Sequence, residues 1–168
     1  MQTFAKILSG GDLRSIGKSN EAVHLIRDQK SFDKLFGCLF HNDRLVVMRT
    51  ADAIEKITIE HPEYLLKHKS KIPELCLSAK KKELKWHLAL LLPRIELNGN
   101  DLSKTLSILK QWAMDKEESR IVRVNSVQGL FELSQKHKNF TNEIKALFQE
   151  LGKENIPSLK ARIKKLKL

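Results

Sequence analysis

Three segments of this chain repeat one pattern of apolar residues at an even spacing. They begin at Val46, Leu84 and Val122, so each starts 38 residues after the one before it. The segments are VVMRTADAIEKI, LKWHLALLLPRI and VRVNSVQGLFEL. In each of them the first, fifth, eighth, ninth and twelfth positions are apolar or small, which places these side chains on one face of an α-helix. An even repeat of this length predicts stacked helical hairpins.

Turn-forming residues lie where hairpins of this kind require them. The first helix of each hairpin is expected within residues 31–40, 64–79 and 102–115, and the repeated segment forms the second helix. Turns are expected at 41–43, 79–82 and 115–118 within the hairpins, and at 61–62 and 98–101 between them. A fourth, truncated copy begins at Leu159, and Pro157 suits the first turn of its helix because its missing N–H is no loss there.

The first 30 residues fit the repeat poorly and are expected to cap it, since the terminal units of repeat proteins are atypical. Within them, 9–12 is predicted to be a loop and 19–29 a helix with Ser19 or Asn20 as its N-cap. We therefore predict a single domain over 1–168, with a cap at 1–30 and repeats at 31–60, 61–97, 98–136 and 137–168.

The third segment, VRVNSVQGLFEL, resembles the second helix of a HEAT repeat, whose pattern is V-R-x-x-A-x-x-A-L-x-x-I. The second position is Lys85, Arg123 or Lys160 in three of the four copies. This resemblance extends over roughly residues 32–168, and the chain is similar to small free-standing bacterial HEAT proteins of unassigned function. It implies an all-α fold, a right-handed α-α superhelix of about four HEAT-like hairpins. It also implies that the second helices line a concave face.

Composition limits the remaining possibilities. The 168 residues include 31 lysines and arginines against 20 aspartates and glutamates, a net charge of +11, which favours anionic partners or serves solubility alone. Cys38 and Cys76 have no metal-ligand spacing and are interpreted as packing residues of equivalent repeats. The apolar run around Leu88 to Leu92 is too short to span a membrane. We predict a cytoplasmic protein without a cofactor or a metal.

The candidate binding residues are the positions of the second helices that do not face the core. They are Arg49, Asp52, Lys56, Trp86, His87, Arg94, Asn125, Gln128 and Arg162. Two interpretations are open for them. Arg49, Asp52 and Lys56 pair with one another along their helix, or the cations and His87 line a groove that donates hydrogen bonds to carboxylates or phosphates.

Two residues of the middle segment have alternatives of their own. Trp86 is either wedged between repeats or an aromatic anchor of the binding face. His87 has no nucleophile at a matched position and no second histidine, so no catalytic residue is predicted. Pro93 is expected to cost the hydrogen bond to the Ala89 carbonyl and to bend the end of the helix.

These features favour a non-enzymatic scaffold or adaptor that binds an acidic protein partner on the concave face. The alternative is a nucleic-acid-binding protein, because lysines cluster at 67–85 and 160–167 and a basic stripe can contact phosphates. Some HEAT-like DNA glycosylases use an aspartate and tryptophans on the concave surface, and Asp52, Trp86 and Trp112 are of these types. The sequence leaves the oligomeric state open.

Overall fold

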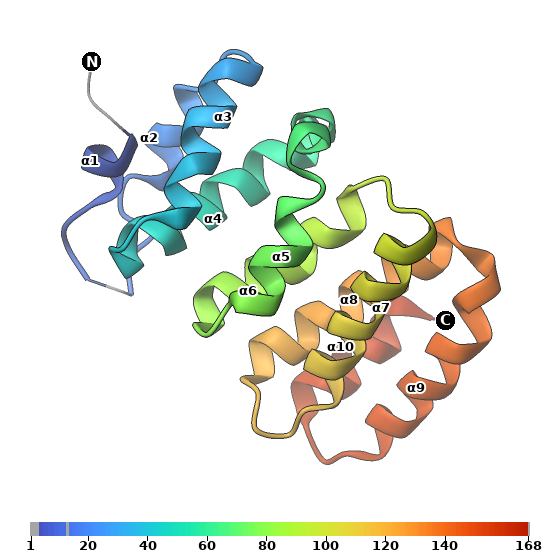
Figure 1. The fold of residues 1–168 in the computed structure, drawn as a ribbon. Helices are drawn as coiled ribbons and strands as arrows, with labels where there is room; N and C mark the ends of the chain where they lie inside the picture. The colour runs from blue at the N-terminus through green and yellow to red at the C-terminus, as the bar shows by residue number, and fades with distance from the viewer. Residues whose placement is uncertain (1–3, 13, 168) are drawn as a thin grey trace. The chain divides into compact units, whose positions relative to one another are not determined.

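The structure is a computed structural model that describes residues 4–12 and 14–167, and every regular element in these ranges is a helix (Figure 1). The all-α fold predicted from the repeat is confirmed. The helices group into two compact units, Met1–His68 and Lys69–Leu168. The division of the chain into one cap and four repeats is a separate description, and it stays a prediction.

The first unit is organised around one long helix. In chain order its elements are α1 (Phe4–Leu8), α2 (Ser19–His24), α3 (Gln29–Gly37), the 3-10 helix η1 (Cys38–Phe40), α4 (Arg44–Glu60) and the 3-10 helix η2 (Pro62–His68). Helix α4 begins after Asp43, whose side chain accepts a hydrogen bond from the Leu45 N–H at 2.8 Å. Its apolar face is buried, and the other elements of the unit pack against it.

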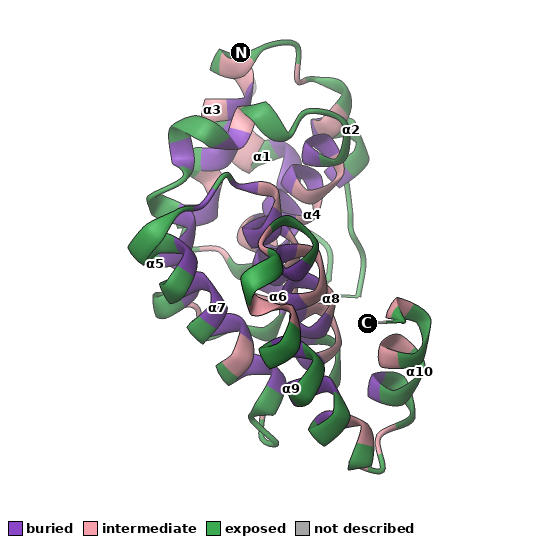
Figure 2. Ribbon diagram, turned by 90° about the vertical axis from the view of Figure 1, so that its right-hand side faces the viewer, coloured by how far each residue is buried: buried purple, intermediate pink, exposed green. Residues whose placement is uncertain are grey.

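The second unit consists of stacked hairpins. Its elements are α5 (Lys71–Ser78), α6 (Lys82–Leu91), the 3-10 helix η3 (Leu92–Arg94), α7 (Gly99–Met114), α8 (Arg120–Lys136), the 3-10 helix η4 (Lys138–Phe140), α9 (Thr141–Lys153) and α10 (Pro157–Leu166). Helix α8 packs against α6, α7 and α10 and is therefore the centre of the unit. Figure 2 shows buried stretches along α6 and α7, where the repeat predicts a core.

Pro93 lies just beyond the α-helix in which the sequence placed it as the cause of a bend. Helix α6 stops at Leu91, and the 3-10 helix η3 takes the chain through Pro93. Against this point lies Gly129 of α8, where an ideal Cβ would be 2.6 Å from the Ala89 carbonyl oxygen and 3.3 Å from Cγ of Pro93. Only a residue without a side chain lets α8 approach α6 this closely.

Two predicted helices are shorter than expected. Helix α2 ends at His24, and its N-cap is Lys18 rather than Ser19 or Asn20, because the Ser19 hydroxyl donates instead to Asp52. Residues 64–79 form η2 and α5 in place of one helix. Pro73 lies in the first turn of α5, and its ring would clash with the preceding turn of a longer helix.

Candidate functional site

The predicted site residue Arg49 is buried and holds the N-terminal segment in place. It is 2% exposed, and its Nη1 donates to the carbonyls of Leu8 at 2.7 Å and Gly10 at 2.5 Å. Nη2 and Nε donate to the carbonyls of Asp12 and Ser15, both at 3.2 Å. The guanidinium therefore supplies donors to four backbone acceptors, one at the end of α1 and three in the segment that follows it.

Gly17 makes room for the Arg49 guanidinium. Its φ is +52°, and an ideal Cβ there would lie 2.6 Å from Cζ of Arg49. A residue with a side chain would meet both a strained backbone and a clash. Gly17 thus belongs to the packing of one buried cation.

Asp52 and Lys56 join α4 to α2. The Ser19 hydroxyl donates to the Asp52 carboxylate, and Lys56 Nζ lies 2.6 Å from the same oxygen. Lys56 Nζ also donates to Oδ1 of Asn20 at 2.8 Å. The structure therefore contains the Asp52 to Lys56 pair of the first interpretation, whereas Arg49 serves the backbone of the N-terminal segment.

Four of the predicted residues in the second unit come together on one face. Asn125 of α8 donates to the Trp86 carbonyl of α6 at 3.0 Å. Arg162 of α10 donates to Oε1 of Gln128 in α8 at 2.8 Å. All four side chains are half-buried. We call Trp86, Asn125, Gln128 and Arg162 the α6–α8–α10 face, since one hydrogen bond joins α8 to α6 and the other joins α10 to α8.

The other predicted residues of this unit have different surroundings. His87 is buried, with its ring 5.5 Å from that of Trp86, and Arg94 is half-buried in η3. Trp112 is buried in α7, where Lys85 Nζ lies 5.6 Å from its ring centroid. Trp112 is therefore not part of an exposed surface of the kind that the glycosylase comparison requires.

Ion pairs between neighbouring repeats were not anticipated from the sequence. Lys85 pairs with Glu118, and Lys110 pairs with Glu143. The buried Arg123 donates from Nε to the Ala113 carbonyl and from Nη2 to Glu154, both at 2.8 Å. The hydrogen bond from Arg123 holds the pKa of Glu154 below its ordinary value. The partners of these three ion pairs are 31 or 33 residues apart in the sequence. This spacing can be recognised only after the repeats have been aligned.

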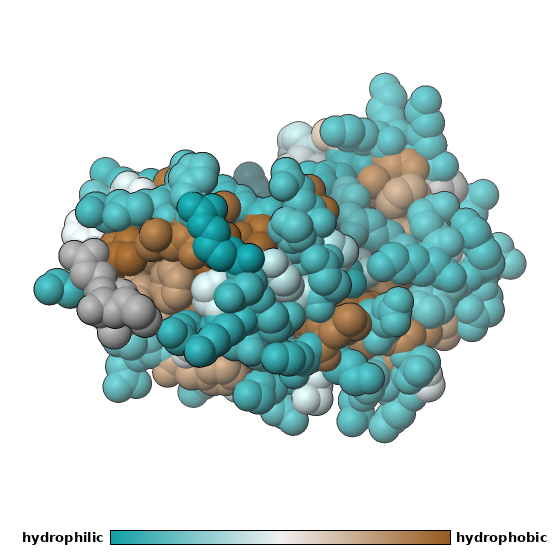
Figure 3. All heavy atoms as spheres, turned by 90° about the horizontal axis from the view of Figure 1, so that it is seen from above, coloured by the Kyte–Doolittle hydropathy of each residue, from teal (hydrophilic) through white to brown (hydrophobic). Residues whose placement is uncertain are grey.

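The positive charge of the chain is concentrated in the second unit. Lys69–Leu168 has 21 lysines and arginines and 11 aspartates and glutamates, a net charge of +10, whereas Met1–His68 has 10 and 9, a net charge of +1. Residues 157–167 contain five of these cations and no acidic residue. Figure 3 shows hydrophilic side chains over most of the face in view, with smaller hydrophobic patches between them.

The described residues offer no group of three or more histidine, cysteine, aspartate or glutamate side chains that could hold a metal ion. No helix in residues 4–12 and 14–167 is both long enough and apolar enough to cross a membrane. Cys38 is half-buried and Cys76 is buried, and both are free thiols.

The hairpins and the periodic burial of their second helices define the chain as an α-helical repeat protein. Residues 9–167 match the family model of the HEAT repeat domain, so the chain belongs to the HEAT repeat domain family. HEAT repeat domains generally act as scaffolds for protein interactions. Neither a curated protein nor a solved structure gave a significant match to the chain.

Proposed function

We propose that the protein is a non-enzymatic scaffold whose α6–α8–α10 face binds an acidic segment of a partner protein. The observation that carries the proposal is the alignment of Trp86, Asn125, Gln128 and Arg162 through two hydrogen bonds between repeats. The two bonds hold the side chains of Asn125, Gln128 and Arg162, whereas Trp86 takes part through its backbone carbonyl. All four side chains are half-buried, so part of each remains accessible.

The residue types on this face suit a peptide. A tryptophan supplies apolar contact area at low entropic cost because its side chain has few rotatable bonds, and tryptophan and arginine are enriched among the residues that dominate binding energy. The amide oxygen of Asn125 can accept a hydrogen bond from a peptide N–H, whereas the Gln128 amide donates to Glu132 and accepts from Arg162, both at 2.8 Å. Arg162 and the net charge of +10 on this unit favour an acidic segment over a basic one.

Arg49 and His87 are too buried to be varied as surface residues, so the test uses the accessible part of the face. A variant with Trp86→Ala, Gln128→Ala and Arg162→Gln is compared with the wild-type chain in a quantitative co-purification from cells. The matched control changes Lys104 and Gln111, which are exposed on α7, to alanine.

We expect the face variant to lose bound proteins that the control retains, while circular dichroism shows both variants folded. Peptides from the lost partners should then bind the wild-type chain in titrations. Their affinity should fall when glutamate and aspartate are replaced by glutamine and asparagine. The same set of bound proteins for the variant and the control would contradict the proposal.

Nucleic-acid binding is the second candidate, and the basic α10 favours it. A pocket of about 200 Å³ between α9 and α10 is lined by Lys145, Lys164 and Lys167 together with Phe148, Gln149 and Ile163. Among the described residues no acidic one lines it, and the polar groups that a phosphate would meet there are three lysines and one amide. Helix α10 continues this charge with Lys160, Arg162 and Lys165.

A labelled 20-nucleotide DNA and the corresponding RNA test this candidate at 50 mM and 200 mM salt. Binding through phosphates must weaken steeply as the salt concentration rises. The double variant Lys145→Gln with Lys164→Gln should make the plot of log binding constant against log salt concentration less steep, by roughly one unit for each of the two lysines that binds a phosphate. The control is Lys104→Gln on α7. No binding of either nucleic acid at the lower salt concentration would exclude this candidate.

A further inference from the structure

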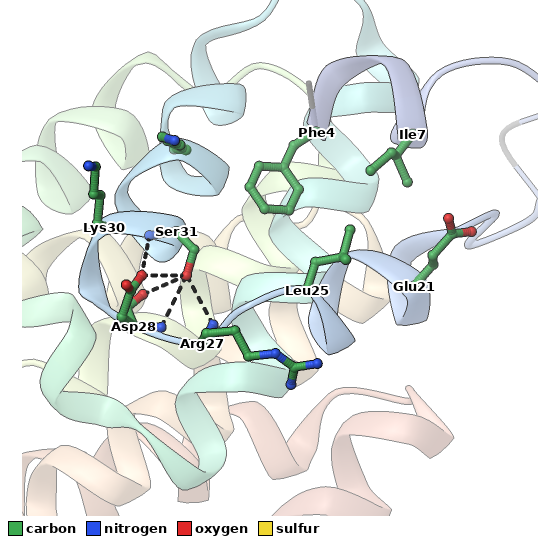
Figure 4. A pocket seen from close by; sticks show the side chains of 9 residues that line it. Phe4, Ile7, Glu21, Leu25, Arg27, Asp28, Lys30 and Ser31 are labelled. Atoms are coloured by element: carbon green, nitrogen blue, oxygen red, sulfur yellow. Dashed lines mark hydrogen bonds between the residues drawn. The ribbon is translucent and has the colours of Figure 1, made fainter. Parts of the chain in front are cut away.

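The first unit contains a pocket that the scaffold function does not use. It has a volume of about 580 Å³ and lies among α1, α2, α3 and the turn that joins α2 to α3 (Figure 4). Its lining residues are Phe4, Ile7, Glu21, Leu25, Arg27, Asp28, Lys30, Ser31 and Lys34. The pocket lies far along the chain from the α6–α8–α10 face and belongs to the other compact unit.

One wall of the pocket is apolar. The side chains of Phe4 and Ile7 from α1 and of Leu25, just after α2, point into the same space (Figure 4). Ile7 is buried, Phe4 is half-buried, and Leu25 is 45% exposed. A large aliphatic side chain held open to solvent against two others favours an apolar ligand group, because covering it removes apolar surface from water.

The rim beside this wall is cationic. Arg27, Lys30 and Lys34 line it, and in the part of the chain that the structure describes none of them is within ion-pair distance of a carboxylate. Arg27 and Lys30 flank the N-terminus of α3, which the Asp28 carboxylate caps, and Lys34 lies in the last turn of the helix.

The two carboxylates of the pocket are already engaged. Asp28 caps α3: its Oδ1 accepts hydrogen bonds from the Ser31 N–H at 2.7 Å and from the Ser31 hydroxyl at 2.8 Å. The hydrogen bond from the Ser31 backbone, followed by that from its hydroxyl, lowers the pKa of Asp28. Glu21 lies 3.4 Å from Lys18 Nζ. The charges of Lys30 and Lys34 also lower the pKa of Asp28. With three cations and two carboxylates among its lining residues, the pocket carries a net charge of +1.

We propose that this pocket binds a small amphipathic organic anion. Its alkyl or aryl body would pack against Phe4, Ile7 and Leu25, and its carboxylate or sulfonate would lie beside Arg27 and Lys34. The volume falls within the roughly 300–1,000 Å³ of small-molecule sites. An apolar wall of three side chains is much smaller than the roughly 800 Å² per partner of a stable protein interface, which disfavours a protein as the occupant.

Octanoate is the probe, and the whole chain is used. Two further compounds separate the contribution of the apolar tail from that of the negative charge. Octanol has the tail without the charge, and acetate has the charge without the tail. Binding is followed by isothermal titration calorimetry, and the site is identified from the amide and methyl resonances of Ile7, Leu25 and Ser31 in two-dimensional NMR.

We expect octanoate to bind at least about tenfold more tightly than either octanol or acetate, because each of these lacks one of the two interactions. Arg27→Gln with Lys34→Gln should weaken octanoate binding about three- to tenfold and leave octanol binding unchanged. Leu25→Ala should weaken both octanoate and octanol about fivefold. Lys6→Gln, which removes a charge from α1 outside the pocket, should change none of these affinities.

The altered side chains are exposed, so each variant is expected to fold, and circular dichroism checks this. Octanoate that shifts resonances elsewhere and not those of the pocket would overturn the proposal. So would equal affinities for octanoate and octanol, or the same loss in the Lys6 control as in the double variant. Tight binding of a peptide with leucine beside glutamate, together with no binding of octanoate, would likewise overturn it in favour of a protein ligand.

Discussion

Gly129→Ala tests how closely α8 packs against α6. In an open helix this change stabilises by up to about 1 kcal/mol, because alanine has the higher helix propensity. Here the new Cβ would lie 2.6 Å from the Ala89 carbonyl oxygen and 3.2 Å from Cδ1 of Leu109. The nearest atom belongs to the backbone, so α6 or α8 must move. Overpacking of this kind costs about 1–3 kcal/mol, so we expect a net loss of about 1–2 kcal/mol.

Gly152→Ala is the matched control for this prediction. Gly152 lies in α9, and an ideal Cβ there has nothing within 4 Å. At about 2–4 °C per kcal/mol for a chain of this size, thermal unfolding followed by circular dichroism should place Gly129→Ala about 2–8 °C below the wild-type Tm. Gly152→Ala should lie slightly above it. A Gly129→Ala variant as stable as the control would refute the close approach of the two helices.

Three further predictions follow from the buried polar groups and the thiols. Arg49→Lys removes most donors to the N-terminal segment, so we expect a loss of about 1–3 kcal/mol and faster tryptic cleavage of that segment; an unchanged rate would contradict the role of Arg49. The lowered pKa of Glu154 means that its bond to Arg123 stabilises above the unfolded pKa of about 4.3 and is lost as pH falls through the folded pKa. Glu154→Gln should therefore destabilise in urea unfolding at pH 7 and have little effect at pH 3, and equal losses at both would contradict this. Burial raises the pKa of the Cys38 and Cys76 thiols, so Ellman's reagent at pH 7.4 should label Cys38 slowly and Cys76 only after unfolding, whereas equal rates would argue against this burial.

The repeat predicted the helices of the core well because their burial depends on periodicity. The apolar positions of α8 follow the same spacing as those of α6, and each set is buried. Helix ends were predicted less well where a side chain had a distant partner. Ser19 is a good N-cap residue by type, but its hydroxyl donates to Asp52, which lies 33 residues further along the chain.

The polar positions of the second helices show a second limit on what the sequence pattern can predict. Arg49 and Arg162 occupy the same position of the repeat, yet Arg49 is buried by the N-terminal segment and Arg162 is half-exposed on α10. Periodicity tells which face of a helix is polar, but it does not tell whether a non-repeating segment covers that face. The pocket among α1, α2 and α3 was missed for the same reason, since α1 and α2 lie outside the repeat.

Arg49 also determines how far the chain can be shortened from its N-terminus. The carbonyls that accept its hydrogen bonds belong to residues 8–15, which carry little of the apolar core. A fragment beginning after residue 18 would keep every repeat helix but would leave a guanidinium without acceptors on α4. A buried charge of this kind must be hydrated, and hydration would open the end of the core. We therefore expect the smallest stable fragment of this protein to include Leu8.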